Sequence, residues 1–165
     1  MNRVFLLDAL KVFTEESVKD ILLPVRQQSD DDGPPEPRPP KVYRMRLKKE
    51  SESTKAAPYI IHQLITSADR QPSGEQEQGR ATVRSIFCVY HEDSEEGALA
   101  LLGLMERQRI DLLRTVVLEN QYQLDLESGL EMLIYPDGTA PYFAGEMICT
   151  WIMPGVRREV DLGGF

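Results

Sequence analysis

Cysteine and histidine are scarce in this sequence, and long apolar runs are missing. Its two cysteines, Cys88 and Cys149, both lie in apolar stretches, which favours buried reduced thiols over a disulfide or a metal pair. The longest apolar stretch, near the N-terminus, is broken by Asp8 and Lys11, so we expect no membrane span. No signal peptide with a small-residue cleavage site is recognisable, so we expect the protein to be made in the cytosol.

Basic residues are outnumbered by acidic ones. There are 19 Lys and Arg against 27 Asp and Glu, which gives a formal net charge of -8. A protein whose main task is to grip phosphates needs clustered lysines and arginines that displace counterions. We therefore expect no specific binding of nucleic acid.

Residues that could carry chemistry are few and poorly spaced. His62 and His91 do not stand at zinc-site spacing with either cysteine. His91, Glu92 and Asp93 follow a predicted strand, but no nucleophile motif or glycine-rich loop accompanies them, which favours a solvated turn over a catalytic group. The runs at residues 30–32, 75–78 and 92–96 do not follow the ligand spacing of a calcium loop. We predict a protein with no enzymatic activity, cofactor or metal.

The length suits one domain over residues 1–165, and 41% hydrophobic residues are enough for its core. Apolar residues at helical spacing predict one helix, or two short ones, over residues 2–23. Residues 27–40 are acidic and proline-rich, so they predict a flexible loop. Alternating side chains then predict strands at residues 42–47 and 59–66.

The second half of the chain continues the same mixture of elements. A polar stretch at residues 67–79 predicts a second flexible loop, and residues 81–90 predict the central strand of a sheet. A capped helix is expected at residues 93–114. Strands are expected at residues 121–127 and 130–135, with a turn leading into the last strand. This order predicts an α+β fold, a mostly antiparallel sheet with helices packed on one face.

The last strand, which ends at Pro154 because proline cannot donate to a ladder, has the clearest pattern. One face carries Tyr142 and Glu146 among apolar residues and is predicted to be a partly covered surface. The other face is predicted to lie in the core, and its side chains are all apolar or small: Phe143, Gly145, Met147, Cys149, Trp151 and Met153.

Residues 155–165 are expected to form an exposed tail beyond the proline. Within it, Arg157, Arg158 and Glu159 suit bidentate contacts with a neighbouring subunit, although a solvated terminus would have the same composition. We take these three residues, together with Tyr142 and Glu146, as the candidate residues of an interface between subunits or with a partner.

Three segments together resemble a known protein family. They are the opening Pro58-Tyr59-Ile60-Ile61, the acidic turn and helix at residues 93–114, and a closing pattern at residues 141–159, Pro-Tyr-Phe-x-Gly-x-Met-x-x-Thr-Trp-x-x-Pro-x-x-Arg-Arg-Glu. In these segments the chain resembles the tail terminator, or tail completion, proteins of long-tailed bacteriophages and prophages. It departs from the usual opening at His62 and Gln63.

The resemblance implies a structural virion protein at the junction of tail and neck, assembled in the cytoplasm of a host bacterium. Six identical copies would form a ring that caps the tail tube, stops its polymerisation and presents a surface to the head-completion or connector protein. DNA would pass through the lumen without specific binding, since a negatively charged wall repels the duplex. No membrane would be involved.

Two alternatives remain open at the level of sequence. A head-closure or connector adaptor of the same neck region would use a similar small α+β subunit. A small ligand-binding or enzymatic α+β domain would instead need a pocket with convergent polar groups.

Overall fold

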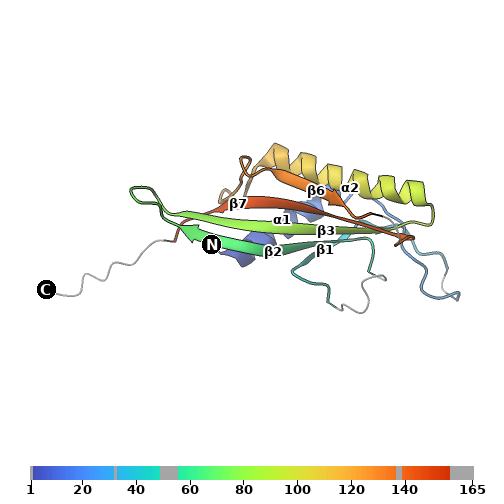
Figure 1. Cartoon of the computed structure of the whole chain (residues 1–165). Coiled ribbons are helices and arrows are strands. Elements are labelled where there is room, and N and C mark those ends of the chain that lie inside the picture. Colours follow the sequence, from blue (N-terminus) through green and yellow to red (C-terminus); the bar gives the residue numbers. More distant parts are fainter. Residues whose placement is uncertain (1, 32, 49–55, 137–138, 157–165) are drawn as a thin grey trace.

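The chain forms the predicted α+β fold, with helices packed on a mostly antiparallel sheet (Figure 1). Several elements differ from their predicted bounds: the strand predicted at 42–47 covers Lys41–Arg44, and the one predicted at 121–127 covers Tyr122–Leu124. The structure is a computed structural model that describes residues 2–31, 33–48, 56–136 and 139–156. The sheet order is β1-β2-β3-β7-β5-β4, with β6 also paired to β7. Among the strand pairs of the described residues, only β1 with β2 is parallel. The elements are α1 Arg3–Val18, β1 Lys41–Arg44, β2 Tyr59–Arg70, β3 Gln78–Tyr90, α2 Ser94–Thr115, β4 Val117–Leu118, β5 Tyr122–Leu124, β6 Leu130–Ile134 and β7 Tyr142–Met153.

Helix α1 is shorter than the predicted 2–23. It begins after Asn2, whose side chain accepts a hydrogen bond from the backbone N–H of Phe5 at 3.0 Å. It ends at Val18. Beyond the helix, Leu23 is buried and exchanges two backbone hydrogen bonds with Arg38, at 2.9 and 3.0 Å. The Leu23 and Arg38 bridge thus connects the end of α1 to the last part of the 27–40 segment.

Arg38 fixes the end of that segment to the strand that follows. Its half-buried guanidinium donates to the carbonyl oxygens of Pro58 at 2.9 Å and Ala56 at 3.0 Å, and burial lowers its pKa. These bonds satisfy carbonyls just before β2.

Helix α2 confirms the helix predicted at residues 93–114, and Asp93 caps it by accepting from the backbone N–H of Glu96 at 2.9 Å. Two apolar residues of α2, Ala98 and Leu102, are exposed. The buried stripe instead follows the 3.6-residue period without interruption and contains Gly97, Leu101, Leu104, Met105, Gln108 and Leu112.

The β2 and β3 strands run further than their sequence predicts. Residues 67–79 were expected to form a loop, but β2 continues to Arg70 and β3 resumes at Gln78, with backbone pairing between Ser67 and Ala81 and onward. We call residues 66–82 the hairpin arm. It projects past the helices at one end of the sheet (Figure 1), and its outer part on β2 is exposed.

The main core lies between the helices and the sheet. On β7 the predicted alternation is confirmed, because Met147, Cys149, Trp151 and Met153 are all buried on the side that faces the helices. The middle of β3 packs there as well, with Phe87 fully buried. A second and smaller cluster lies on the opposite face of the sheet.

Two glycines of α2 give a matched test of this packing. A Cβ at Gly97 would stand 2.3 Å from the ring of Phe143, whereas a Cβ at Gly103 would meet nothing within 4 Å. We expect Gly97→Ala to destabilise the fold by about 1–3 kcal/mol through overpacking. Gly103→Ala is expected to stabilise it by about 0.5–1 kcal/mol through helix propensity. Urea unfolding followed by circular dichroism measures both, and equal effects at the two sites would contradict the helix placement.

Candidate interaction surface

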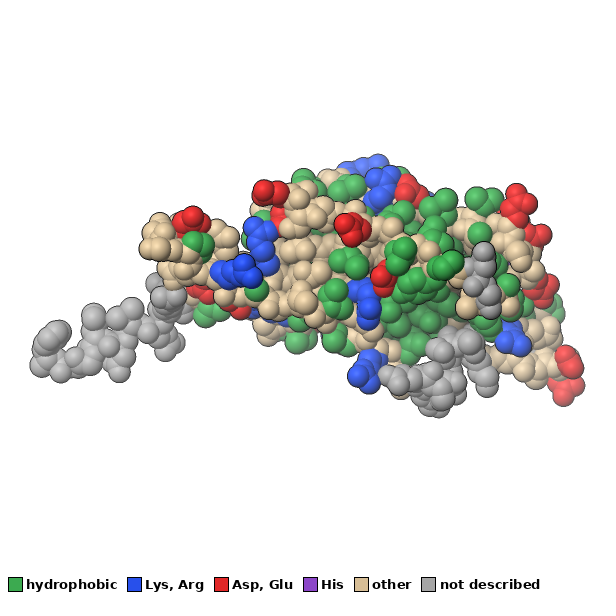
Figure 2. All heavy atoms as spheres, viewed as in Figure 1, with side chains coloured by type: hydrophobic (Ala, Val, Ile, Leu, Met, Phe, Trp, Pro, Cys, Tyr) green, Lys and Arg blue, Asp and Glu red, His purple; other side chains and the backbone are tan. Residues whose placement is uncertain are grey.

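Apolar side chains gather on the face of the sheet opposite the helices, where they form a small cluster of buried and half-buried residues. We call this face the open face. Figure 2 looks onto it and shows apolar side chains concentrated over one half of the sheet. Tyr59, Ile61 and Cys88 form the buried centre of this group with Ala57. Half-buried side chains surround them: Tyr43, Leu47, Ala56, Ile86, Tyr90, Tyr142 and Ala144.

A row of polar side chains crosses the open face next to the apolar group. Arg84 on β3 donates to Gln63 Oε1 on β2 at 3.2 and 2.8 Å and stands 4.0 Å from Glu146 on β7. Tyr135, just after β6, donates its hydroxyl to Glu146 Oε2 at 2.8 Å. The row therefore spans neighbouring strands from β2 to the end of β6, and we call it the polar ladder.

The polar ladder is oriented but only partly shielded. The side chain of Glu146 is 15% exposed, whereas that of Arg84 is 39% exposed. Burial raises the pKa of Tyr135, and its hydrogen bond to Glu146 raises it further. An arginine and a carboxylate held beside apolar side chains give this part of the surface a defined pattern of charge.

Tyr142, the second candidate residue on this face, is already engaged within the protomer. Its hydroxyl accepts from Arg26 Nη1 at 2.8 Å, and the Arg26 guanidinium stands 5.9 Å from the ring centroid. The ring also lies 5.6 Å from that of Tyr90 in a tilted arrangement. Tyr142 thus joins the segment after α1 to the open face.

The sequence-predicted interface residues divide into two groups. Tyr142 and Glu146 lie on the same face of β7, as their alternation predicts. Arg157, Arg158 and Glu159 fall outside the described residues. Sequence reasoning missed Gln63, Arg84 and Tyr135, although the register of β2 with β3 would have placed Gln63 opposite Arg84.

The open face continues onto the hairpin arm, where it becomes polar. A hollow of about 550 Å³ is lined by side chains of β2 and β3 and by Thr150 of β7. Arg80 on the arm pairs with Asp125, whose side chain is only 5% exposed. Asp125 also accepts from the backbone N–H of Glu127 at 3.2 Å, which closes the turn between β5 and β6. The base of the arm is therefore tied to the body.

The soft ligand candidates do not converge. His62 is fully buried between the helices and the sheet, and the backbone N–H of Asp93 donates to His91 Nδ1 at 3.0 Å in the turn before α2. Cys88 lies on the open face and Cys149 on the helix face, and both are free thiols. Among the described residues no group of three or more His, Cys, Asp or Glu is placed to hold a metal ion.

A buried polar network around His62 was not foreseen from the sequence. His62 Nε2 is 2.9 Å from Thr14 Oγ1 on α1, and Nδ1 is 2.7 Å from Ser85 Oγ on β3. Gln108 on α2 donates to the same Thr14 hydroxyl at 2.8 Å. The network joins both helices to the sheet, and burial lowers the pKa of His62 to about 4.

Comparison with known proteins adds no relationship to these observations. No protein-family model matches the chain, and no curated protein sequence matches it. The helices that the structure describes are also not long and apolar enough to cross a membrane.

Proposed function

We propose that the protein is a structural subunit that assembles with copies of itself into a ring. The observation that supports this best is the open face, where an apolar group and a fixed polar ladder lie side by side without a covering layer of helices. The hairpin arm extends the same sheet beyond the body and offers a second contact area. Such a subunit can contact one neighbour with its open face and another with its arm.

A ring follows from this arrangement because the two contact areas differ. A heterologous contact, in which one surface meets a different surface of the next copy, closes into a ring if its rotation divides a full turn.

The resemblance to tail terminator proteins gives the ring its proposed role. The ring is a homohexamer at the tail-neck junction of a long-tailed phage virion, formed in the host bacterial cytoplasm. One ring face binds the last tail tube subunits and ends their polymerisation, and the other presents a surface to the head-completion or connector protein. The formal net charge of -8 suits a lumen through which DNA passes without binding.

Native mass spectrometry and particle imaging test this proposal together. We expect a six-fold assembly, either of the protein alone or on the ends of purified tail tubes. Virions produced without the protein are expected to carry overlong tails, because nothing stops the tube. Tails of normal length that lack heads would instead favour a connector adaptor. A protein that stays monomeric with tubes present would contradict both roles.

A further inference from the structure

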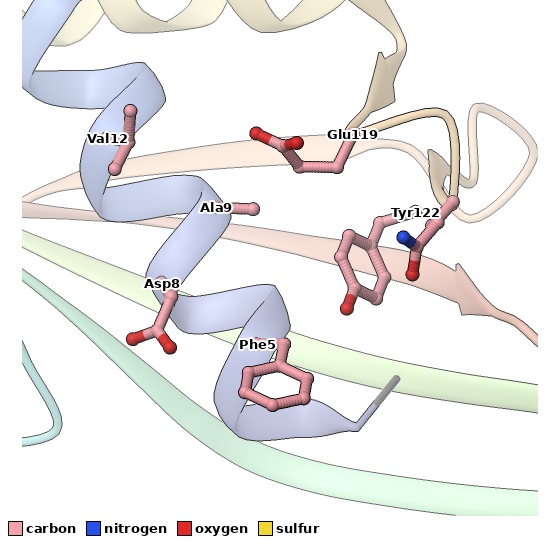
Figure 3. A pocket seen from close by; sticks show the side chains of 7 residues that line it. Phe5, Asp8, Ala9, Val12, Glu119 and Tyr122 are labelled. Carbon is pink, nitrogen blue, oxygen red and sulfur yellow. The ribbon is translucent and has the colours of Figure 1, made fainter.

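A groove separates α1 from the turn that joins β4 to β5 (Figure 3). Its floor is formed by Ala9 and Tyr122, which are both buried. On the helix side Phe5 and Val12 line it, and each is more than half exposed, at 51% and 61%. Glu119 lies across the groove with its carboxylate directed toward α1. The cavity measures about 380 Å³.

The groove combines apolar walls with a free negative charge. Within the part of the chain that the structure describes, Glu119 forms no hydrogen bond or ion pair. Asp8 also lines the groove, but it is paired with Arg44 and its carboxylate points away from Glu119 (Figure 3). Burial raises the pKa of Tyr122, and the carboxylates of Glu119 and Asp8 add to this increase. A fitting occupant is therefore a segment with a cation followed by apolar side chains.

We propose that the occupant is the segment 157–165 of a neighbouring copy. It begins with Arg157 and Arg158, either of which can give Glu119 a bidentate partner. Val160 and Leu162 follow at a spacing of two, which places them on one side of an extended chain. They would contact Phe5 and Val12. This inference rests on the proposed assembly of copies and adds a contact to those proposed for the open face and the hairpin arm.

The chain leaves the sheet at an exposed position near the groove. β5 pairs Gln123 with Ile152, so the end of β7 lies beside the start of β5 and hence beside the protomer's own groove. Gly155 and Val156 are nevertheless exposed, Val156 at 66%, so the chain has left the body before Arg157. Residues 157–165 can span at most about 30 Å when extended. That reach suits the same groove on an adjacent subunit.

Disulfide trapping in the full-length protein tests the contact. We expect the double variant Val12→Cys with Val160→Cys, once oxidised, to give a ladder of covalent multimers on a non-reducing gel. The native thiols do not interfere, because Cys88 and Cys149 are both buried. The control pair is Leu99→Cys with Val160→Cys, in which the exposed α2 position should give no ladder. Cross-linked monomer alone, or no cross-link, would overturn the inference.

A charge exchange on the trapping background identifies the partners. Glu119→Arg alone, or Arg157→Glu with Arg158→Glu, is expected to reduce the ladder at least about fivefold. A mixture of the two variants should restore it, because each groove then meets a tail of opposite charge. Glu127→Arg, on an exposed site elsewhere, should leave it unchanged. A six-fold particle that gives no ladder would refute the groove contact and leave the proposed function standing.

Discussion

Replacing Trp151 by alanine is expected to cost about 3–5 kcal/mol of folding free energy, the range typical of truncating a buried large aromatic side chain. Trp151 is fully buried on the helix face of β7, where it is paired with Ala81 of β3 and Leu124 of β5. A cavity at this point removes contacts from several strands at once. Since domains are commonly stable by only about 5–15 kcal/mol, the variant is expected to be partly unfolded at 37 °C.

The conservative variant Trp151→Phe separates the energetic contribution of aromatic packing from that of the indole N–H. The indole Nε1 of Trp151 is buried without an oxygen or nitrogen partner among the described residues, so its removal sacrifices at most a weak contact with the Cys149 thiol. We expect Trp151→Phe to cost well under half as much as Trp151→Ala. Leu99→Ala, at an exposed position on α2, serves as the control and should change stability by less than about 0.5 kcal/mol. Urea unfolding followed by far-ultraviolet circular dichroism gives all three values, and a Trp151→Ala cost below about 1 kcal/mol would show that the core is placed wrongly.

The alternation on β7 was readable from the sequence because one side chain in two enters the core. Met147, Cys149 and Trp151 are apolar for that reason, and the structure buries all three. The hairpin arm was not readable, since Ser67 and Asp69 have low strand propensity. They are held by partners far along the chain, as Arg3 donates to Ser67 Oγ at 2.8 Å and to Asp69 Oδ1 at 2.7 Å. Propensity within a short window contains no information about such contacts.

The open face was predictable in outline and not in detail. The sequence placed Tyr142 and Glu146 on the face of β7 away from the core, and the structure confirms that position. The partners of Glu146 depend on which strands flank β7, and strand order follows from the packing of the whole sheet. The contacts of Glu146 with Arg84 and Tyr135 could therefore be identified only from the folded structure.

The network around His62 shows a similar limit. In the sequence His62 interrupts an apolar strand and could be judged only as a weak ligand candidate. Its partners Thr14 and Gln108 come from the two helices, and their interior positions look like errors in the apolar stripes. Each of these elements has a polar residue at a position where its pattern predicts an apolar one. Because buried polar groups need hydrogen bonds, these residues could have been predicted to bind one another.

Acid is expected to weaken the fold through this network well before it protonates the buried ring. Burial lowers the pKa of His62 in the folded protein to about 4, against an ordinary value of 6.5. As the pH falls below about 6.5, His62 binds a proton in the unfolded chain but stays neutral in the folded protein. The free energy of unfolding therefore decreases until the pH reaches about 4. The full difference corresponds to about 3 kcal/mol, of which about 2 kcal/mol is lost between pH 7 and pH 5.

Substitution by glutamine isolates this effect, because an amide can keep hydrogen bonds to Thr14 and Ser85 without titrating. His62→Gln is expected to lower stability at pH 7 and to lose about 2 kcal/mol less than the unmodified protein on going to pH 5. The neighbours of His62 in the network are the neutral side chains Thr14, Ser85 and Gln108, so they leave the proton without a counter-charge. If His62→Gln and the unmodified protein weaken in parallel between pH 7 and pH 5, the ring is either solvated or already charged in the folded state.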